Sequence, residues 1–327
     1  MSLERPVDTL SSVAPLLRVK PELQQLCRFG AQWASEHVAE TDRWAPFHLV
    51  TRGGCVLQLS GQGRMITLAA GDIVVLPHGT PHVVRGPSTP PDACGPFGIR
   101  SQPFGPVELK SNTQGRPQTQ LICGRLHFDL AHPNLLLAAL PQAIVVSAAD
   151  EQAEASRLRM FMSAIQEEIE ANQAGAAAIA TDLASALFVM VVRIHLNGEG
   201  CNSGLLGLLA HQRAGRAVAA MLDDPVKSWT LDELAARANA SRASLVRMFQ
   251  RTAQRTPLAI LTELRLELAR RKLSATVLPL AAIADDIGYR SESAFSRAFH
   301  RRFGMRPGEA RAGAARAALS SSGRAAT

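Results

Sequence analysis

The chain has 327 residues, of which 46% are apolar and 19% charged, so it is long enough for two domains that each bury a sizeable core. Its five cysteines, at positions 27, 55, 94, 123 and 201, follow neither a disulfide framework nor a CxxC zinc pattern, which predicts reduced thiols. There is no charged-then-apolar leader, and Asp182 and Ser185 interrupt the best apolar stretch, so we expect a cytoplasmic protein without a membrane span.

Charge is divided unevenly along the chain. The formal net charge is +7, but residues 211–327 carry 20 Lys and Arg against 10 Asp and Glu, whereas residues 1–210 carry 15 against 18. A basic part joined to a mildly acidic part predicts one region that meets phosphates and one that does not.

Short apolar runs alternate with glycine turns in the N-terminal part, between Phe47 and Val84. The runs are FHLV, CVLQLS, MITL, DIVVL and HVV. This spacing predicts β-strands of a small barrel or jelly roll. LICGRLHFDL at 121–130 and LLAALPQAIVV at 136–146 continue the same domain, which we place over residues 1–148.

The segment GDIVVLPHGTPH, residues 71–82, has glycine, proline, glycine and histidine in a fixed order. It resembles the second sequence motif of the cupins, and this resemblance implies a cupin-like β-barrel. Metal-binding cupins carry a close pair of histidines and a carboxylate in their first motif. Here only His48 remains of that set.

Two interpretations of His48 and His82 stay open. Paired strands would bring the two motifs together, and a cysteine thiolate would complete a metal site, since such sites need three or four convergent ligands. Alternatively, His82 caps a strand and His48 is a hydrogen-bonded residue of the barrel. A cupin-fold metalloenzyme with an accessory helical domain is the competing class of function. The eroded first motif argues against it, so we expect no enzyme, and a metal ion in the barrel is the one cofactor left open.

Residues 149–222 are predicted to form a helical connector. ASRLRMFMSAIQEEIE at 155–170 and AIATDLASALFVMVVRIHL at 178–196 are amphipathic, and a third helix is expected from Leu205 to Leu222. The second helix has a broad apolar face that either packs on the barrel or forms a homodimer interface. It consists of Leu183, Leu187, Met190, Val191 and Ile194.

The segment TLDELAARANASRASLVRMFQRT, residues 230–252, predicts two helices joined by a turn at Asn239–Ala240. Ser241 is placed to cap the second helix. In that helix apolar side chains fall on one face, while Arg242, Arg247 and Gln250 share the other. A helix with this division is suited to reading a DNA groove.

The same design recurs about fifty residues later, in LPLAAIADDIGYRSESAFSRAFHRRFGMRPGEAR at 278–311. Ala281, Ala282, Ile283 and Ile287 are expected on a buried face, and the helix ends at Gly288. The following helix begins at a Ser291 cap, has Phe295, Ala298 and Phe299 inside, and ends at Gly304. Between the two units, a long helix from Pro257 through Leu273 would hold them about 34 Å apart, one turn of DNA.

RLELARRKL at 265–273 and IGYRSESAFSRAFHRRFGMRP at 287–307 carry a family resemblance. The chain resembles the AraC/XylS family of bacterial transcription regulators, including members with a cupin sensor domain. The resemblance implies double-stranded DNA and RNA polymerase as partners. It also implies the positions that face bases or their flanking phosphates, which are Arg242, Arg247, Ser293, Ser296 and Arg297. The predicted DNA-binding set adds neighbouring polar residues of the same two helices, namely Gln250, Glu292, His300 and Arg301. Three features depart from the family pattern: Gln254 replaces a C-cap glycine, Lys272 replaces an apolar residue, and the first recognition helix carries Ala243 and Val246 on its outer face. We therefore expect the first unit to read fewer base edges than the second.

One subgroup of this family responds to reactive chlorine species through cysteines of the cupin domain, and Cys27 in LCRFGAQW resembles one such position. Gln120 stands where the second cysteine of that pair is expected. Cys94 lies in a Pro/Gly-rich loop, where we expect exposure, while Cys55 and Cys123 are expected inside strands. The sensor residues predicted for an oxidant or a small-molecule effector are Cys27, Cys94, His48 and His82.

The sequence therefore predicts a multi-domain α+β protein. It has a cupin-like β-barrel over residues 1–148, a helical connector over 149–222 and an all-α double helix-turn-helix over 223–311. The Ala/Ser/Arg-rich tail over 312–327 is predicted to be disordered. The predicted function is sequence-specific DNA binding in transcription regulation, with a signal in the barrel changing how the two helix-turn-helix units are presented.

Overall fold

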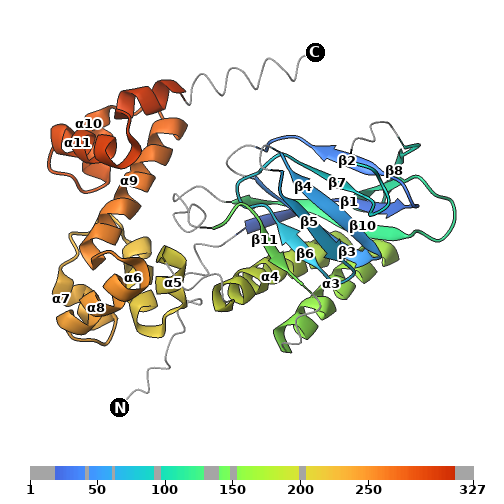
Figure 1. Cartoon of the computed structure of the whole chain (residues 1–327), viewed down its shortest axis with the longest axis horizontal. Coiled ribbons are helices and arrows are strands. Elements are labelled where there is room, and N and C mark those ends of the chain that lie inside the picture. Colours follow the sequence, from blue (N-terminus) through green and yellow to red (C-terminus); the bar gives the residue numbers. More distant parts are fainter. Residues whose placement is uncertain are drawn as a thin grey trace. The chain divides into compact units, whose positions relative to one another are not determined.

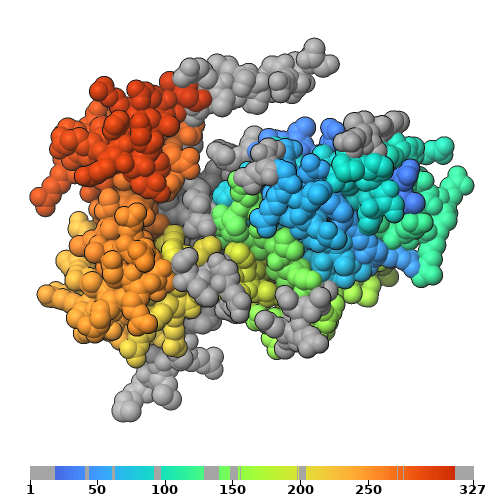
Figure 2. All heavy atoms as spheres, in the orientation of Figure 1, coloured from blue at the N-terminus to red at the C-terminus, as the bar shows by residue number. Residues whose placement is uncertain are grey.

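The computed structural model describes residues 19–40, 44–60, 63–91, 97–128, 140–147, 153–198 and 204–313. These residues belong to two compact units (Figure 1). The barrel unit holds the described residues up to 198, and the helical unit holds those from 204 onward. In the space-filling view the barrel unit is blue to yellow-green and the helical unit yellow to red (Figure 2).

The barrel unit contains two β-sheets. The larger has the strand order β11-β6-β3-β10-β1-β9-β8 and the smaller the order β2-β7-β4-β5. The strands of the larger sheet are β1 (Val19–Phe29), β3 (Trp44–Arg52), β6 (Ile73–Val75), β8 (Arg100–Phe104), β9 (Val107–Ser111), β10 (Thr119–Phe128) and β11 (Ile144–Val146). Those of the smaller sheet are β2 (Ala34–His37), β4 (Gly54–Leu59), β5 (Met65–Ala69) and β7 (His82–Arg85).

The core of the barrel follows from the two-residue period of its strands. In β4 and β5 every second side chain is buried, so that Cys55, Leu57, Leu59, Ile66 and Leu68 point inward. These side chains belong to one cluster with residues of the larger sheet, including Val50 and Leu121. The expected strands between residues 47 and 84 are confirmed. The segments 121–130 and 136–146, expected to continue the domain, contribute to β10 and β11, while residues 129–130 and 136–139 lie outside the described residues.

Strands β1, β2, β8 and β9 are additions to the predicted set. Along β1, VKPELQQLCRF, a proline and five polar side chains obscure the alternation, so the sequence pattern is weak. This strand is held by its partners instead, since it pairs with β10 antiparallel and with β9 parallel. Cys27 lies on this strand, and its side chain is buried in the core of the barrel.

The glycine of the cupin-like motif is required by the close approach of two chain segments. Gly79 has φ +63°, and a Cβ there would lie 2.9 Å from the backbone oxygen of Glu40. Glu40 N donates to Gly79 O over 3.0 Å in the same turn. The turn places His82 at the first position of β7.

Two helices cover the larger sheet: α3 (Ala153–Ala171) packs on β3, and α4 (Ala176–Asn197) packs on β1, β11 and α3 (Figure 1). Leu187, Met190 and Val191 of α4 are buried. Most of the apolar face of this helix therefore packs within the barrel unit. By length and composition alone, Ala176–Leu196 could also cross a membrane. Here its apolar side chains pack on the barrel. The expected 149–222 connector is thus divided, since α3 and α4 belong to the barrel unit.

The helical unit begins with α5 (Gly204–Ala210) and α6 (Gln212–Asp223). One helix had been expected from Leu205 to Leu222, and this expectation is wrong. His211 breaks it, because its side chain accepts hydrogen bonds from the backbone N–H groups of Arg213 and Ala214 and so caps a new helix.

The described part of this unit continues with α7 (Leu231–Arg237), α8 (Arg242–Ala253), α9 (Pro257–Ala275), α10 (Leu280–Asp286) and α11 (Glu292–Phe303), followed by a short helix over 307–313. Ser241 and Ser291 cap α8 and α11, as expected, by accepting from Ser244 N and Ala294 N. On α10, Ile283 is buried as expected, but Ala281 is exposed and Ala284 is buried instead.

Candidate nucleic-acid interface and barrel site

Helices α8 and α11 have the same construction, with an aromatic inner face and a cationic outer face. Leu245 and Phe249 of α8 are buried, whereas Arg247 and Gln250 are exposed. On α11, Phe295, Ala298 and Phe299 are buried, while the outer positions carry Glu292, Ser293, Arg297, His300 and Arg301, all exposed, and half-buried Ser296. Burial of the aromatic faces fixes each helix in its unit and leaves the polar face to solvent.

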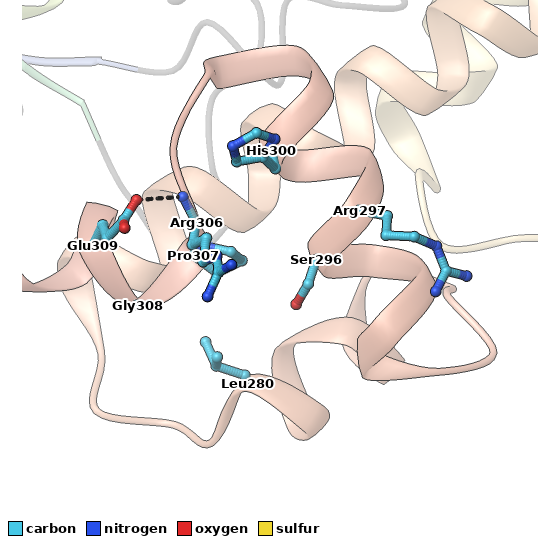
Figure 3. A pocket seen from close by; sticks show the side chains of 8 residues that line it. All are labelled: Leu280, Ser296, Arg297, His300, Arg306, Pro307, Gly308 and Glu309. Atoms are coloured by element: carbon cyan, nitrogen blue, oxygen red, sulfur yellow. Dashed lines mark hydrogen bonds between the residues drawn. The ribbon is translucent and has the colours of Figure 1, made fainter.

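The outer face of α11 borders a surface pocket (Figure 3). Ser296, Arg297 and His300 line it from α11, and Arg306 and Glu309 line it from the segment that follows. Arg306 N donates to the Glu309 carboxylate over 2.7 Å, which caps the short helix over 307–313. Four of these five side chains can donate a hydrogen bond, the chemistry that phosphate and base edges require.

Arg242 differs from the other arginines of these helices. Its guanidinium is bound by both carboxylate oxygens of Asp232 on α7. For Arg247 and Arg297, by contrast, no ion pair is found among the described residues. Arg242 is therefore positioned by an acidic neighbour, while Arg247 and Arg297 present unneutralised charge.

Helix α9 contacts both helix pairs, α7–α8 and α10–α11. Its 19 residues extend over about 28 Å, close to one turn of DNA. Arg265 fixes it to the loop before α7, donating to the carbonyls of Pro225, Val226 and Lys227. Lys272, unexpected in this position, pairs with Asp286 of α10 over 2.8 Å. The sequence pattern had not marked Arg265 as a structural residue.

Inside the barrel, a His–Cys pair of the larger sheet meets a His–His pair of the smaller sheet. His48 on β3 lies opposite Cys123 on β10, and His37 on β2 lies opposite His82 on β7. The rings of His37 and His82 are stacked, with centroids 4.6 Å apart and an interplanar angle of 2°. His48 Nε2 lies 2.8 Å from His82 Nε2, so the two sheets are joined at this point.

Hydrogen bonds extend from this contact in both directions. His48 Nδ1 lies 3.1 Å from Cys123 Sγ, and His82 Nδ1 lies 2.8 Å from the Thr80 carbonyl oxygen. His48 and His82 are each 1% exposed, so water does not compete for these bonds. The expectation that the two motif histidines lie together in the barrel is supported by this geometry.

All three imidazoles are neutral near pH 7. Burial, together with His82 and Lys110, lowers the pKa of His37 to about 3. Burial and the neighbouring histidines hold the pKa of His48 well below its usual value. The pKa of His82 is lowered by burial as well, with the Thr80 hydrogen bond opposing. Neutral imidazole is the form that binds metals.

Burial sets the reactivity of the cysteines in the barrel. Cys27 and Cys123 are buried, and a hydrogen bond between their thiols, together with burial, raises the pKa of Cys123. Burial also raises the pKa of Cys55 to about 12. A raised pKa disfavours the reactive thiolate. Cys94 lies outside the described residues. Gln120, at the position where the family resemblance places a second sensor cysteine, is buried and donates to Glu170 of α3.

His37 is the functional candidate that sequence reasoning missed. It stands in ASEH, a short segment with no motif around it, and only the pairing of β2 with β7 brings it to His82. The signal available in the sequence was weak, namely a histidine at the end of a short polar run.

Comparison with known proteins agrees with both units. A cupin family model matches residues 8–197, and a helix-turn-helix domain model matches residues 234–313. The RCS-specific HTH-type transcriptional activator RclR of Escherichia coli is 29% identical over 305 residues, covering 93% of this chain and 97% of that protein. A putative AraC-like transcription regulator of Streptomyces lividans is 34% identical over 307 residues, covering 93% and 98%. A crystal structure of the DNA-binding domain of AdpA with a target DNA covers 30% of this chain and 87% of that chain, at 31% identity and a TM-score of 0.29.

A cupin barrel together with a double helix-turn-helix defines a DNA-binding transcription regulator. The chain belongs to the AraC family of these regulators, as a member with an N-terminal cupin domain.

Proposed function

We propose that α8 and α11 enter neighbouring major grooves of duplex DNA and that Arg247 and Arg297 read or anchor the site. The observation that carries this is the shared construction of the two helices. Each is capped by serine, buries its aromatic face and exposes an arginine that no described acidic residue neutralises. Arginine in the major groove makes bidentate contacts with guanine.

The other exposed residues of α8 and α11 have supporting roles in this proposal. Gln250, Ser293, Ser296, His300 and Arg301 contact flanking phosphates or base edges, and Glu292, in the first turn of α11, is an acceptor for cytosine. RNA polymerase and a homodimer partner follow from the family and stand as proposals. So does action in the cytoplasm, where a DNA-binding regulator meets the chromosome.

We infer further that the input acts inside the barrel, around His48 and His82. These buried polar side chains link the two sheets, so a change there alters how the sheets pack. A metal or a small molecule is favoured over cysteine oxidation as the signal, since Cys27 is buried beside Cys123 and the pKa of Cys123 is raised. RclR, named as RCS-specific, keeps oxidant sensing as the second candidate.

DNA binding can be tested with the full chain and a labelled duplex from the region upstream of its own gene, first located by footprinting. Arg297→Ala and Arg247→Ala should each weaken specific binding by about 1–3 kcal/mol and weaken binding to random duplex less. With about six phosphate contacts, log Kd plotted against log salt should have a slope near 5 in magnitude. Equal losses on both DNAs would reduce the two arginines to phosphate contacts, and affinity independent of salt would contradict DNA binding by this face.

A further inference from the structure

Three histidines of the barrel unit, contributed by both sheets, form a set of nitrogen donors that converge on one point. His37, His48 and His82 each offer one ring nitrogen, and these three atoms lie within 4.8 Å of one another. Two belong to one sheet and the third to the other, so the set is fixed by strand pairing and not by a loop. Sites built on strands hold ligand geometry more firmly than sites on loops.

The hydrogen bonds around the histidines determine where their protons lie. A carbonyl oxygen can only accept, so His82 Nδ1–H donates to Thr80 O, and the neutral ring has a bare Nε2. His48 must then donate Nε2–H to His82 Nε2, which leaves His48 Nδ1 to accept from the Cys123 thiol. The result is a directed chain from Cys123 through His48 and His82 to Thr80.

We propose that His37, His48 and His82 bind one divalent transition-metal ion, with His48 and His82 using Nε2, and that Cys123 is an outer partner that orients His48. Three imidazoles suit an ion of the zinc class and leave a further position for water or a ligand. The motif resemblance supplied only His48 and His82; His37 and the role of Cys123 come from the structure.

For His48 and His82, the two ligands already in contact, the geometry requires only a small change for an ion to enter. Two nitrogens that bind one tetrahedral ion at about 2.0–2.1 Å lie roughly 3.3 Å apart. The His48 and His82 Nε2 atoms, now 2.8 Å apart, would therefore separate by about half an ångström. The proton on His48 moves from Nε2 to Nδ1, the ring stays neutral, and Nδ1–H then donates to Cys123 Sγ. Outer hydrogen bonds of this kind fix the tautomer of a ligating histidine.

The test uses the full chain, stripped of metal with a chelator and then titrated with Zn²⁺ in competition with a fluorescent zinc indicator. We expect one tight equivalent, weakened more than about 100-fold by His37→Gln or His82→Gln, since loss of a ligand exceeds the effect of losing an outer partner. Cys123→Ala should weaken binding by about 10–100-fold. Cys123→Ser, which keeps an acceptor for His48 Nδ1–H, should recover part of the loss.

Two controls keep the test decisive. His127→Gln, on β10 beside Trp44 and away from the cluster, should bind Zn²⁺ like the wild type. Co²⁺ bound to the wild-type chain should give ligand-field absorption bands without a sulfur-to-cobalt charge-transfer band. This measurement does not depend on the folding of any variant. A charge-transfer band, or Zn²⁺ binding that both histidine variants retain, overturns the proposal. The metal site rests on the proposed function, in which the barrel receives the signal. Because these measurements use no DNA, the metal site and the regulation of DNA binding can each fail without the other.

Discussion

Arg242 and Arg247 stand on the same helix, α8, in different electrostatic surroundings. Asp232 binds Arg242 through both carboxylate oxygens, and both side chains are more than half exposed. An exposed ion pair of this kind adds little stability. On the proposed DNA-binding face, its main effect should be electrostatic, because it cancels one positive charge that phosphate would otherwise meet.

Asp232→Asn should therefore tighten DNA binding. The change removes one negative charge and frees the Arg242 guanidinium, which adds about one phosphate contact and steepens the salt slope by about one. At 0.1 M salt one such contact corresponds to an increase of up to roughly tenfold in DNA affinity, which fluorescence anisotropy of a labelled duplex can measure.

Asp286→Asn is the matched control for this change. It removes the same charge from the same unit but releases Lys272, which is not on α8 or α11. A gain as large as that of Asp232→Asn would mean that net charge alone is responsible. Weaker binding by Asp232→Asn would instead mean that the carboxylate is needed to orient Arg242.

At the scale of elements, the ends of α8 and α11 occupy equivalent positions with different residues. Gln254 has φ 56° and Gly304 has φ 72°, both left-handed. Glycine adopts this conformation without steric cost, whereas a residue with a Cβ is strained there. The family pattern has glycine at both helix ends, so the first unit carries a small local strain that the second lacks.

Gln254→Gly should stabilise the helical unit by about 0.5–1 kcal/mol. This is the net effect, because relief of the left-handed strain is partly offset by the greater conformational freedom of glycine in the unfolded chain. The reciprocal change, Gly304→Ala, should destabilise the unit by a similar amount. Both effects can be read from urea unfolding followed by circular dichroism. An unchanged midpoint for Gln254→Gly would show that the glutamine is unstrained in this turn.

The barrel should lose stability in mild acid when no metal is present. His37, His48 and His82 have pKa values below 6.5 in the folded chain, so unfolding takes up protons as the pH falls below 6.5. The free energy of unfolding should therefore rise between pH 5 and pH 6.5, by at most about 1.4 kcal/mol per pH unit for each histidine. Above pH 6.5 it should level off. Thermal unfolding in the presence of a chelator measures this.

A His82→Gln variant provides the comparison for the acid effect. It removes one titrating group and should make the rise between pH 5 and pH 6.5 shallower, whatever its stability at pH 7. A slope identical to that of the wild type would place the titrating groups elsewhere in the chain.

How much the sequence predicts depends on whether an interaction is local. Caps at Ser241 and Ser291, the end of α11 at Gly304 and the strands around Gly79 follow from short patterns, and the structure has them all. His37 could not be assigned, since its role depends on β2 pairing with β7 across about forty-five residues of chain. The break at His211 was missed because histidine is an uncommon cap.

Burial of Cys27 is a further case in which the larger fold decides. A motif resemblance marked it as a sensor, but β1 lies between β10 and β9 in the sheet, and the thiol points into the core. No local pattern indicates which strands flank β1. The same placement brings Cys27 next to Cys123 and so links it to the histidine cluster.

At the scale of the whole molecule, the acidic and basic parts of the chain correspond to different tasks. The barrel unit holds the cluster of His37, His48 and His82, and the helical unit holds the exposed Arg247 and Arg297. If the regulator senses through the barrel, the two tasks must be coupled thermodynamically. Such couplings are typically about 1–3 kcal/mol, which corresponds to a 5–150-fold change in affinity.

Coupling of this kind is reciprocal, which gives a strict prediction for the full chain. If Zn²⁺ changes the Kd for the footprinted duplex by some factor, saturating duplex must change the Kd for Zn²⁺ by the same factor. His82→Gln should abolish both effects while leaving metal-free DNA binding intact, because the residue lies in the barrel and not on α8 or α11. Unequal factors would point to a second zinc site, and a factor of one in both directions would mean that the barrel metal, even when bound, is not the signal.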